Sequence, residues 1–332
     1  MKLPVKLKTI FNFEWRRAVL KKIFAAVMGF ALVICMAGCS KGPADSSQGI
    51  KVVCATAPLY DWTRNITAGT DSADLSLLIG NGTDLHSFQP SAADIIAIKN
   101  ADVLIYVGGT SDGWIRDALK ESTNKEQKVV CLMDELKAYI VEEEVVEGMQ
   151  GEDEEEEEKE YDEHVWLSLR LASRSCEAIE KALSSVSSKD ADKYKANLES
   201  YLAKLSALDK QYEEMIKSAR LDTIVVCDRY PFRYLTEDYK IKYSAAFVGC
   251  SAETEASFET VKFLADKVRE LDVKTVLTIE KSDGRIAKTV IETAGRQDVK
   301  SEVLDSMQSE GKDLDYLGTM TSNLTVLKNA LA

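Results

Sequence analysis

Residues 190–219 read D-A-D-K-Y-K-A-N-L-E-S-Y-L-A-K-L-S-A-L-D-K-Q-Y-E-E-M-I-K-S-A, the clearest helical pattern in the sequence. Their apolar side chains recur mostly at alternating steps of four and three, which places them on one face of a helix. These residues are Tyr194, Leu198, Tyr201, Leu202, Leu205, Leu208, Tyr212 and Met215. Such a helix would span about 45 Å, which is longer than one small domain needs. A coiled-coil helix and an intramolecular strut both fit this pattern. The stripe covers only about four heptads, so we favour a strut between two lobes.

Short apolar segments alternate with helical patterns on both sides of this strut. Before it, strands are expected at residues 51–56, 74–79, 102–107 and 128–132, with helices over 58–66, from Ser91 and over 114–119. After it, strands are expected at 223–227, 243–248, 275–279 and 303–304, with helices over 257–271, 284–293 and 314–331. This alternation predicts two α/β lobes, each built on a parallel sheet and joined by a long rigid helix.

The expected lobe boundaries follow from these patterns. The N-terminal lobe takes residues 51–188, the connecting helix 189–219 and the C-terminal lobe 220–332. Within the first lobe, residues 141–163 hold fourteen Asp and Glu against one Lys. Repulsion between like charges predicts that this acidic loop is solvated, mobile and outside the core. It could also raise the local concentration of cations near a binding site.

The first 39 residues have the pattern of a targeting segment. Seven Lys and Arg precede an apolar run at residues 23–37, which is too short for an ordinary membrane-spanning helix. The run ends in M-A-G-C, and small residues before Cys39 resemble the lipobox of bacterial lipoproteins. We therefore expect lipidation at Cys39, a flexible tether over 40–50, and a protein anchored to the outer face of the cell membrane. A plain cleaved signal or a membrane anchor is the alternative.

Charge and cysteine content narrow the classes of partner. The formal net charge is −13, and without the first 38 residues it is −19, from 35 basic and 54 acidic side chains. This charge argues against nucleic acid and suits a cationic ligand, although ordinary solubility explains many of these residues. Five cysteines follow Cys39 at irregular spacing without a C-x-x-C pair, which disfavours a disulfide framework or a zinc finger.

The chain has only two histidines, His86 and His164, and both lie between an expected strand and an expected helix. Loops in such positions commonly carry binding residues, so we interpret the two imidazoles as the nitrogen ligands of a metal site. In the second lobe, five polar side chains fall at expected strand ends, where parallel sheets gather their ligands. These are Cys227, Asp228, Cys250, Glu280 and Asp305.

The chemistry of these donors indicates the metal. Two imidazoles with two carboxylates suit Mn²⁺, Fe²⁺ or Zn²⁺, and a thiolate in place of one carboxylate favours Zn²⁺. Each residue taken alone also has an ordinary explanation, as a loop residue, a helix cap or a core side chain. The sequence lacks the H-E-x-x-H of zinc hydrolases and the G-x-x-x-x-G-K of phosphate-binding loops. We therefore expect a binding protein and no catalytic residues.

At this point the sequence resembles the substrate-binding lipoproteins of bacterial zinc and manganese ABC importers, over nearly the whole mature chain. The segment G-N-G-T-D-L-H-S-F-Q-P-S at 80–91 is similar to the first-ligand segment of that family, and D-E-H-V-W-L-S at 162–168 to the second. G-C-S-A-E-T-E-A-S at 249–257 and V-L-D-S-M at 303–307 resemble two later segments. The resemblance implies that His86, His164 and Asp305 are metal ligands on a periplasmic-binding-protein-like fold.

The third ligand departs from the family pattern. Zinc members carry a histidine in a segment like F-H-D-A-Y-G-Y, where this chain has V-C-D-R-Y-P-F-R-Y with Cys227 in that place. The glutamate of manganese members is also missing near Gly249. We expect Cys227 to be the third ligand, with Glu280, Asp228, Cys250 or water as alternatives.

The resemblance implies a binding protein that passes a divalent metal, with zinc favoured, to an ABC permease driven by its ATPase. A manganese or iron importer component is the alternative, as is a surface adhesin or metal sensor on the same fold. A rigid connecting helix further predicts modest lobe closure on metal binding.

Overall fold

The structure of the protein is a computed structural model, which describes residues 49–332 except 81, 123, 151–159 and 252–254. The expected signal segment, Cys39 and most of the tether lie outside these described residues. Residues Gly49–Ala332 form one compact unit by their internal contacts. Within the described ranges, no helix combines the length and the apolar character needed to cross a bilayer.

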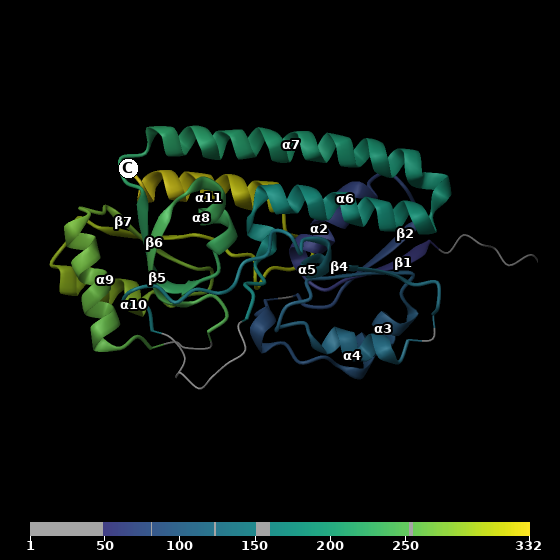
Figure 1. Cartoon of the computed structure of the whole chain (residues 1–332), viewed down its shortest axis with the longest axis horizontal. Coiled ribbons are helices and arrows are strands. Elements are labelled where there is room, and N and C mark those ends of the chain that lie inside the picture. Colours follow the sequence, from purple (N-terminus) through teal and green to yellow (C-terminus); the bar gives the residue numbers. More distant parts are fainter. Residues whose placement is uncertain (1–48, 81, 123, 151–159, 252–254) are drawn as a thin grey trace, which may run out of the picture. The chain divides into compact units, whose positions relative to one another are not determined.

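The first lobe is built on a parallel sheet with strand order β2-β1-β3-β4. Its strands are β1 (Ile50–Cys54), β2 (Ala73–Leu77), β3 (Val103–Tyr106) and β4 (Lys128–Cys131). Its helices are α2 (Ala57–Ile66), α3 (Ala92–Asn100), α4 (Trp114–Lys120), α5 (Leu132–Glu135) and α6 (Leu169–Val186). Helices α2 and α6 lie on the side of the sheet nearer α7, and α3 and α4 lie on the other side (Figure 1). The predicted strands and helices of this lobe are confirmed, with ends shifted by one or two residues.

The second lobe is a parallel sheet with strand order β6-β5-β7-β8. Its strands are β5 (Thr223–Tyr230), β6 (Lys242–Val248), β7 (Thr275–Thr278) and β8 (Lys300–Val303). Its helices are α8 (Arg233–Tyr239), α9 (Phe258–Glu270), α10 (Arg285–Ala294) and α11 (Tyr316–Ala330). Helix α8 was not predicted, and β5 was expected to end three residues early, at Cys227. The strand continues past an irregular register between Val226 and Arg229.

Local sequence signals explain where several helices begin. The Ser91 hydroxyl accepts the Asp94 backbone N–H at the start of α3, and the Asp94 carboxylate accepts the Ser91 backbone N–H, which forms a capping box. Ser257 caps α9 in the same way through the backbone N–H of Thr260. Pro58 lies in the first turn of α2, where its missing N–H is not needed.

The long helix α7 (Ala191–Ser218) packs along both lobes. It contacts α2 and α6 of the first lobe and α8 and α11 of the second, and it runs over the two sheets in Figure 1. Its predicted stripe is buried except for Leu202, which is half-buried. The Tyr212 hydroxyl donates to the Met320 carbonyl of α11 at 2.6 Å. The strut is therefore confirmed, because the apolar face packs inside the chain and not against a partner helix.

Side-chain alternation in β5 divides the second lobe between two apolar cores. Ile224 and Val226 join the large core that continues through α7 into the first lobe. Val225 and Cys227 point to the opposite face, into a separate core under α9 and α10. One apolar cluster thus spans both lobes, which favours a rigid connection between them.

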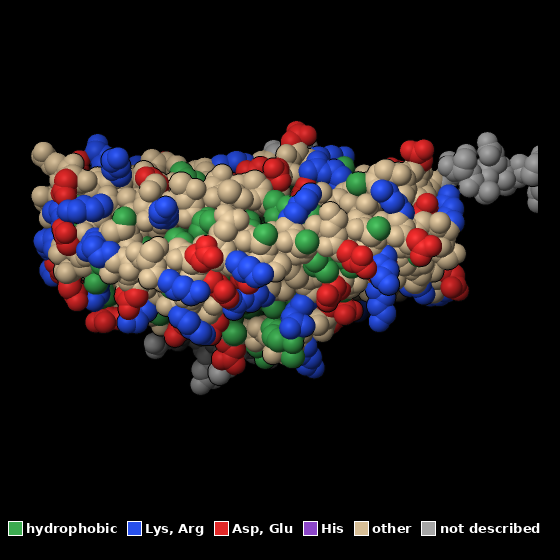
Figure 2. Space-filling model, turned by 90° about the horizontal axis from the view of Figure 1, so that it is seen from above, with side chains coloured by type: hydrophobic (Ala, Val, Ile, Leu, Met, Phe, Trp, Pro, Cys, Tyr) green, Lys and Arg blue, Asp and Glu red, His purple; other side chains and the backbone are tan. Residues whose placement is uncertain are grey.

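The structure confirms that the acidic loop is exposed at Glu142, Glu144, Glu147 and Glu160, but the prediction is wrong for the end of the loop that precedes His164. Asp162 and Glu163 are only 2% and 1% exposed, and Met149 is buried. The Gln150 backbone N–H donates to Ala246 of β6, and residues 142 and 161 form an antiparallel bridge. Backbone pairing and side-chain hydrogen bonds therefore override like-charge repulsion here; residues 151–159 lie outside the described ranges. On the surface seen in Figure 2, acidic and basic side chains are interspersed.

Candidate metal centre

His86 is held on the first lobe by the short 3₁₀ helix η1 (Leu85–Ser87). Asp84 caps this turn by accepting the His86 backbone N–H at 3.0 Å. The His86 Nδ1 atom lies 2.7 Å from the Ser111 hydroxyl and 3.3 Å from Glu163 Oε1. Burial, followed by the positive charge of His164, lowers the pKa of His86 to about 3. The imidazole is therefore neutral at physiological pH, which is the form that binds a metal.

His164 is completely buried and precedes the 3₁₀ helix η2 (Val165–Leu167). Its Nδ1 lies 3.0 Å from Asp162 Oδ1, and the same oxygen accepts the His164 backbone N–H at 2.8 Å. Burial alone would lower the pKa of His164, but the carboxylates of Asp162, Glu163 and Glu143 together outweigh it and raise this pKa. A carboxylate on Nδ1 fixes the ring and leaves Nε2 as the metal-binding nitrogen.

The two imidazoles face each other through Nε2 atoms 3.4 Å apart. When both rings are neutral, the carboxylates beside their Nδ1 atoms hold the protons there, so both Nε2 atoms carry lone pairs. Two acceptors at this distance repel each other unless a cation or a shared proton lies with them. In the metal-free chain, the proton that the raised pKa of His164 retains can bridge the two Nε2 atoms, and a bound metal ion would take its place.

Glu163 joins the site from the residue next to His164 and is 1% exposed. Its Oε2 accepts the Ser111 backbone N–H at 3.0 Å, and its Oε1 accepts the Ser111 hydroxyl. Gly109 packs so closely on this carboxylate that a Cβ there would lie 2.1 Å from Glu163 Oε2. The glycine therefore makes room for a buried acidic side chain.

Cys250 reaches the site from the second lobe, in the turn after β6. Its Sγ lies 3.9 Å from Glu163 Oε1, and its backbone N–H donates to Glu143 Oε1 at 3.2 Å. Burial, and then the carboxylates of Glu163 and Glu143, raise the pKa of the Cys250 thiol. A bound cation would offset these negative charges and favour the thiolate.

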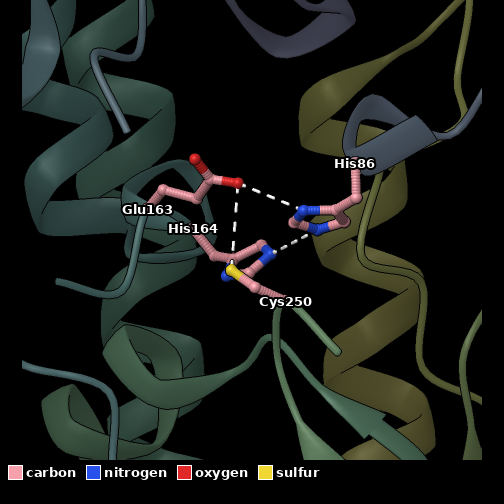
Figure 3. A group of neighbouring side chains, drawn as sticks. All are labelled: His86, Glu163, His164 and Cys250. Atoms are coloured by element: carbon pink, nitrogen blue, oxygen red, sulfur yellow. Dashed lines mark hydrogen bonds and ion pairs between the residues drawn. The ribbon is translucent and has the colours of Figure 1, made fainter. Parts of the chain in front are cut away.

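Four donor atoms thus converge from both lobes. The side chains of His86, Glu163, His164 and Cys250 offer ligand atoms that all lie within 4.8 Å of one another. Figure 3 shows all four side chains pointing toward one another. Two imidazoles, one thiol and one carboxylate are the donor types of zinc sites, and Mn²⁺ prefers sets richer in oxygen.

Ser111 belongs to the segment G-T-S-D-G at 109–113, between β3 and α4, which has the G-x-S-x-G spacing of a hydrolase nucleophile. In such enzymes the serine and the acid contact opposite ring nitrogens of the histidine. Here Ser111 and Glu163 both contact Nδ1 of His86. The three side chains are therefore not arranged as a Ser-His-acid triad, and the hydroxyl orients His86 and Glu163.

The structure places the other predicted ligands elsewhere. Cys227 is completely buried in the core under α9 and α10, because it lies inside β5 and not at its end. Asp305 Oδ1 accepts the Met307 backbone N–H at 2.8 Å, and Asp305 is not among the four clustered residues. Glu280 accepts hydrogen bonds from Ser306 and from the Gln308 backbone. The structure brings together the two histidines, and the ligand roles of all these residues stay predictions.

A cavity of about 540 Å³ adjoins His86 and separates parts of the two lobes. Asp228 and Glu280 line this cavity, together with Arg229, Lys281 and Arg285. Both carboxylates were expected as ligand alternatives, and the structure places them in the lining of the cavity that His86 also lines. Glu163 was not predicted, although the quoted motif D-E-H contains it, and Cys250 was expected only as an alternative.

The fold and the site together define a class: a two-lobed α/β binding protein with a candidate metal centre between its lobes. A family model described as zinc-uptake complex component A, periplasmic (ZnuA), matches residues 52–330. The chain belongs to this family.

Several relatives set the scale of the similarity. The chain is 28% identical over 314 residues to the zinc-binding lipoprotein AdcA of Streptococcus pneumoniae, covering 93% of this chain but 61% of AdcA. It is 29% identical to the high-affinity zinc uptake system protein ZnuA of Bacillus subtilis, covering 93% of this chain and 97% of that protein. The crystal structure of the Zn(II)-bound ZnuA-like domain of AdcA matches with a TM-score of 0.67 and 26% identity, over 85% of this chain and 99% of the domain. The laminin-binding protein Lmb of Streptococcus agalactiae, described as an adhesin with metal transporting activity, matches with a TM-score of 0.68 and 25% identity, over 86% and 100% of the two chains.

Proposed function

We propose that this chain binds one zinc ion between its lobes and delivers it to an ABC importer. The observation that carries this proposal is the convergence of His86, Glu163, His164 and Cys250, with ligand atoms within 4.8 Å of one another. Membership of the zinc-uptake family and the similarity to a Zn(II)-bound domain support zinc as the cargo. In this proposal the protein binds and releases the zinc ion and catalyses no reaction.

The donor set supports zinc over manganese or iron. A thiolate binds borderline and soft cations more strongly than hard ones, and His86 and His164 add two further nitrogen donors. The ligand set proposed here takes Glu163 and Cys250 in place of Cys227 and Asp305. Its net charge also fits, because the carboxylate and thiolate together neutralise a divalent ion.

Delivery and anchoring are further parts of the proposal. The curated relatives are named as a lipoprotein and as part of an uptake system. We infer that Cys39, in the M-A-G-C motif, carries the lipid that holds this chain at the outer face of the membrane. There the loaded lobes would dock on a permease whose partner ATPase drives import. Growth of cells lacking the chain in zinc-depleted medium tests delivery: unimpaired growth and zinc content would contradict it.

Metal titration of the full-length chain tests the binding site. We expect one tightly bound Zn²⁺ per chain, weaker Mn²⁺ binding, and loss of tight zinc binding in His164→Ala and Cys250→Ala. Cys227→Ala is the matched control, because it removes a thiol from the core and leaves the cluster intact. Absence of tight zinc binding would refute the proposed function. Loss of binding in Cys227→Ala, with Cys250→Ala unchanged, would instead refute the proposed ligand set.

A second function is favoured by one observation, the similarity to Lmb, whose description names adhesin activity. Adhesion would need an exposed surface and not the buried metal donors. Binding of the full-length chain to immobilised laminin, with and without zinc, tests this function. Absence of binding above an unrelated acidic lipoprotein would exclude it for laminin.

A further inference from the structure

The residues that carry His86 belong to the first lobe, but the second lobe holds them. We call residues 82–88 the His86 loop. Within it, Asp84 uses its two oxygens for different partners. Oδ1 accepts the His86 backbone N–H at 3.0 Å, and Oδ2 accepts Arg229 Nη2 at 2.6 Å. Arg229 comes from β5 of the second lobe, so one carboxylate links the backbone of a metal donor to the opposite lobe.

A second contact joins the same loop to the second lobe. Lys281 Nζ donates to the Gly82 carbonyl at 2.8 Å and lies 3.4 Å from the Ser309 carbonyl. Gly82 has φ +84°, which favours glycine, and a Cβ there would lie 2.7 Å from Lys281 Nζ. A side chain at position 82 would therefore strain the turn and push the lysine away. Two residues before His86 therefore contact cationic side chains of the second lobe: Gly82 contacts Lys281, and Asp84 contacts Arg229.

Burial makes the Arg229–Asp84 pair stronger than a typical surface ion pair. The two side chains are 16% and 25% exposed, and both residues line the cavity beside His86. A shielded, hydrogen-bonded pair of charges resists separation more than an exposed one. Lys281 is more exposed, so its contact contributes less.

We propose that Arg229 and Lys281 are positioning residues that latch the His86 loop to the second lobe, and that the Arg229–Asp84 pair sets how fast the metal is released. The claim about the rate of metal release rests on the proposed function. Breaking the pair frees the loop beside the cavity that it lines, and His86 then leaves the metal. Glu163, His164 and Cys250 remain as three donors, which hold the ion less tightly.

Hydrogen exchange of the metal-free, full-length chain tests the latch without any metal. In the His86 loop, the backbone N–H groups of Ser87 and Phe88 bond within the loop, and that of His86 bonds to Asp84. We expect amide exchange of this loop to rise about tenfold in Arg229→Gln and in Asp84→Asn. In Asp84→Asn the new amide side chain retains an oxygen to cap His86, so this variant removes only the charge pair. Arg296→Gln is the matched control, since Arg296 is 19% exposed and pairs with Asp298 at 2.8 Å outside the cavity.

Zinc release into excess chelator tests the consequence. We expect dissociation to be about tenfold faster in Arg229→Gln and in Asp84→Asn, and not faster again in the double variant, because both remove one interaction. Arg229→Lys should recover part of the slow release. Rates multiplied in the double variant, or rates equal to the unmodified chain, would overturn the latch. If the chain binds no zinc, the proposed function fails, and loop exchange in the metal-free chain still decides whether the latch exists.

Discussion

Replacing Glu163 by glutamine separates a metal ligand from a structural carboxylate. The side chain is 1% exposed, so its charge is not screened by solvent. It lies 3.3 Å from His86 Nδ1 and 3.9 Å from Cys250 Sγ, and it accepts the Ser111 backbone N–H at 3.0 Å. Glutamine has nearly the same size and can still accept from Ser111, but it carries no charge for a cation.

The expected loss follows from these contacts. A hydrogen bond or ligand bond to a charged group contributes about 1.5–3 kcal/mol, and about 1.4 kcal/mol corresponds to tenfold in Kd. We therefore expect zinc to bind about ten- to a hundredfold more weakly to Glu163→Gln. In the metal-free chain the expected effect is opposite in sign. Burial and then the charge of Glu163 raise the pKa of Asp112 to about 7, so removing that charge relieves repulsion between buried acids.

Two measurements on one variant check this reasoning. Competitive zinc titration should give the weaker Kd, and thermal unfolding of the metal-free chain should give a midpoint no lower than that of the unmodified chain. Glu160→Gln, an exposed residue of the same acidic segment, is the control and should change neither. Unchanged zinc affinity in Glu163→Gln would refute its role as a ligand. A lower metal-free midpoint would refute the argument about charge repulsion.

Further predictions concern protons, carboxylates and the strut. Zinc binding should release at least one proton near neutral pH, because neighbouring carboxylates outweigh burial to raise the pKa of His164, and burial and carboxylates raise the pKa of Cys250. Zinc affinity should therefore rise with pH. Calorimetry in buffers of different ionisation enthalpy measures the number of protons released. Asp305→Asn should leave zinc affinity unchanged. Burial and then Glu280 raise the pKa of Asp305 to about 6, so ionised Asp305 lowers stability as pH rises from about 4 through 6, and the variant should lose this decline in denaturant titrations. Tyr212→Phe should cost about 1 kcal/mol of unfolding free energy, because the buried hydrogen bond from the tyrosine hydroxyl to the Met320 carbonyl is lost, with zinc affinity unchanged in the same titration. Small-angle scattering should detect only modest closure when zinc binds, since one apolar core spans both lobes.

The architecture and half of the candidate site follow from the sequence alone. Period-3.6 and period-2 patterns depend on local geometry, so the stripe of α7, the helix start at Ser91 and seven of the strands were readable without any tertiary contact. The last strand was expected at 303–304, and the structure has it earlier, as β8. The two histidines were informative because they are so few, and the motif around each placed it in a loop between a strand and a helix.

Which residues complete the site depends on long-range packing. Cys227 and Cys250 are both thiols near strand ends in sequence, and local patterns do not separate them. Cys227 lies inside a strand that runs on to Tyr230, so alternation turns it into the core under α9 and α10. Cys250 lies in a turn that tertiary contacts bring to the first lobe. Likewise, a run of like charges predicts that Glu163 is solvated. It is buried beside His164 because the backbone of Gly109 and Ser111, which is distant in sequence, packs against it and donates to its carboxylate.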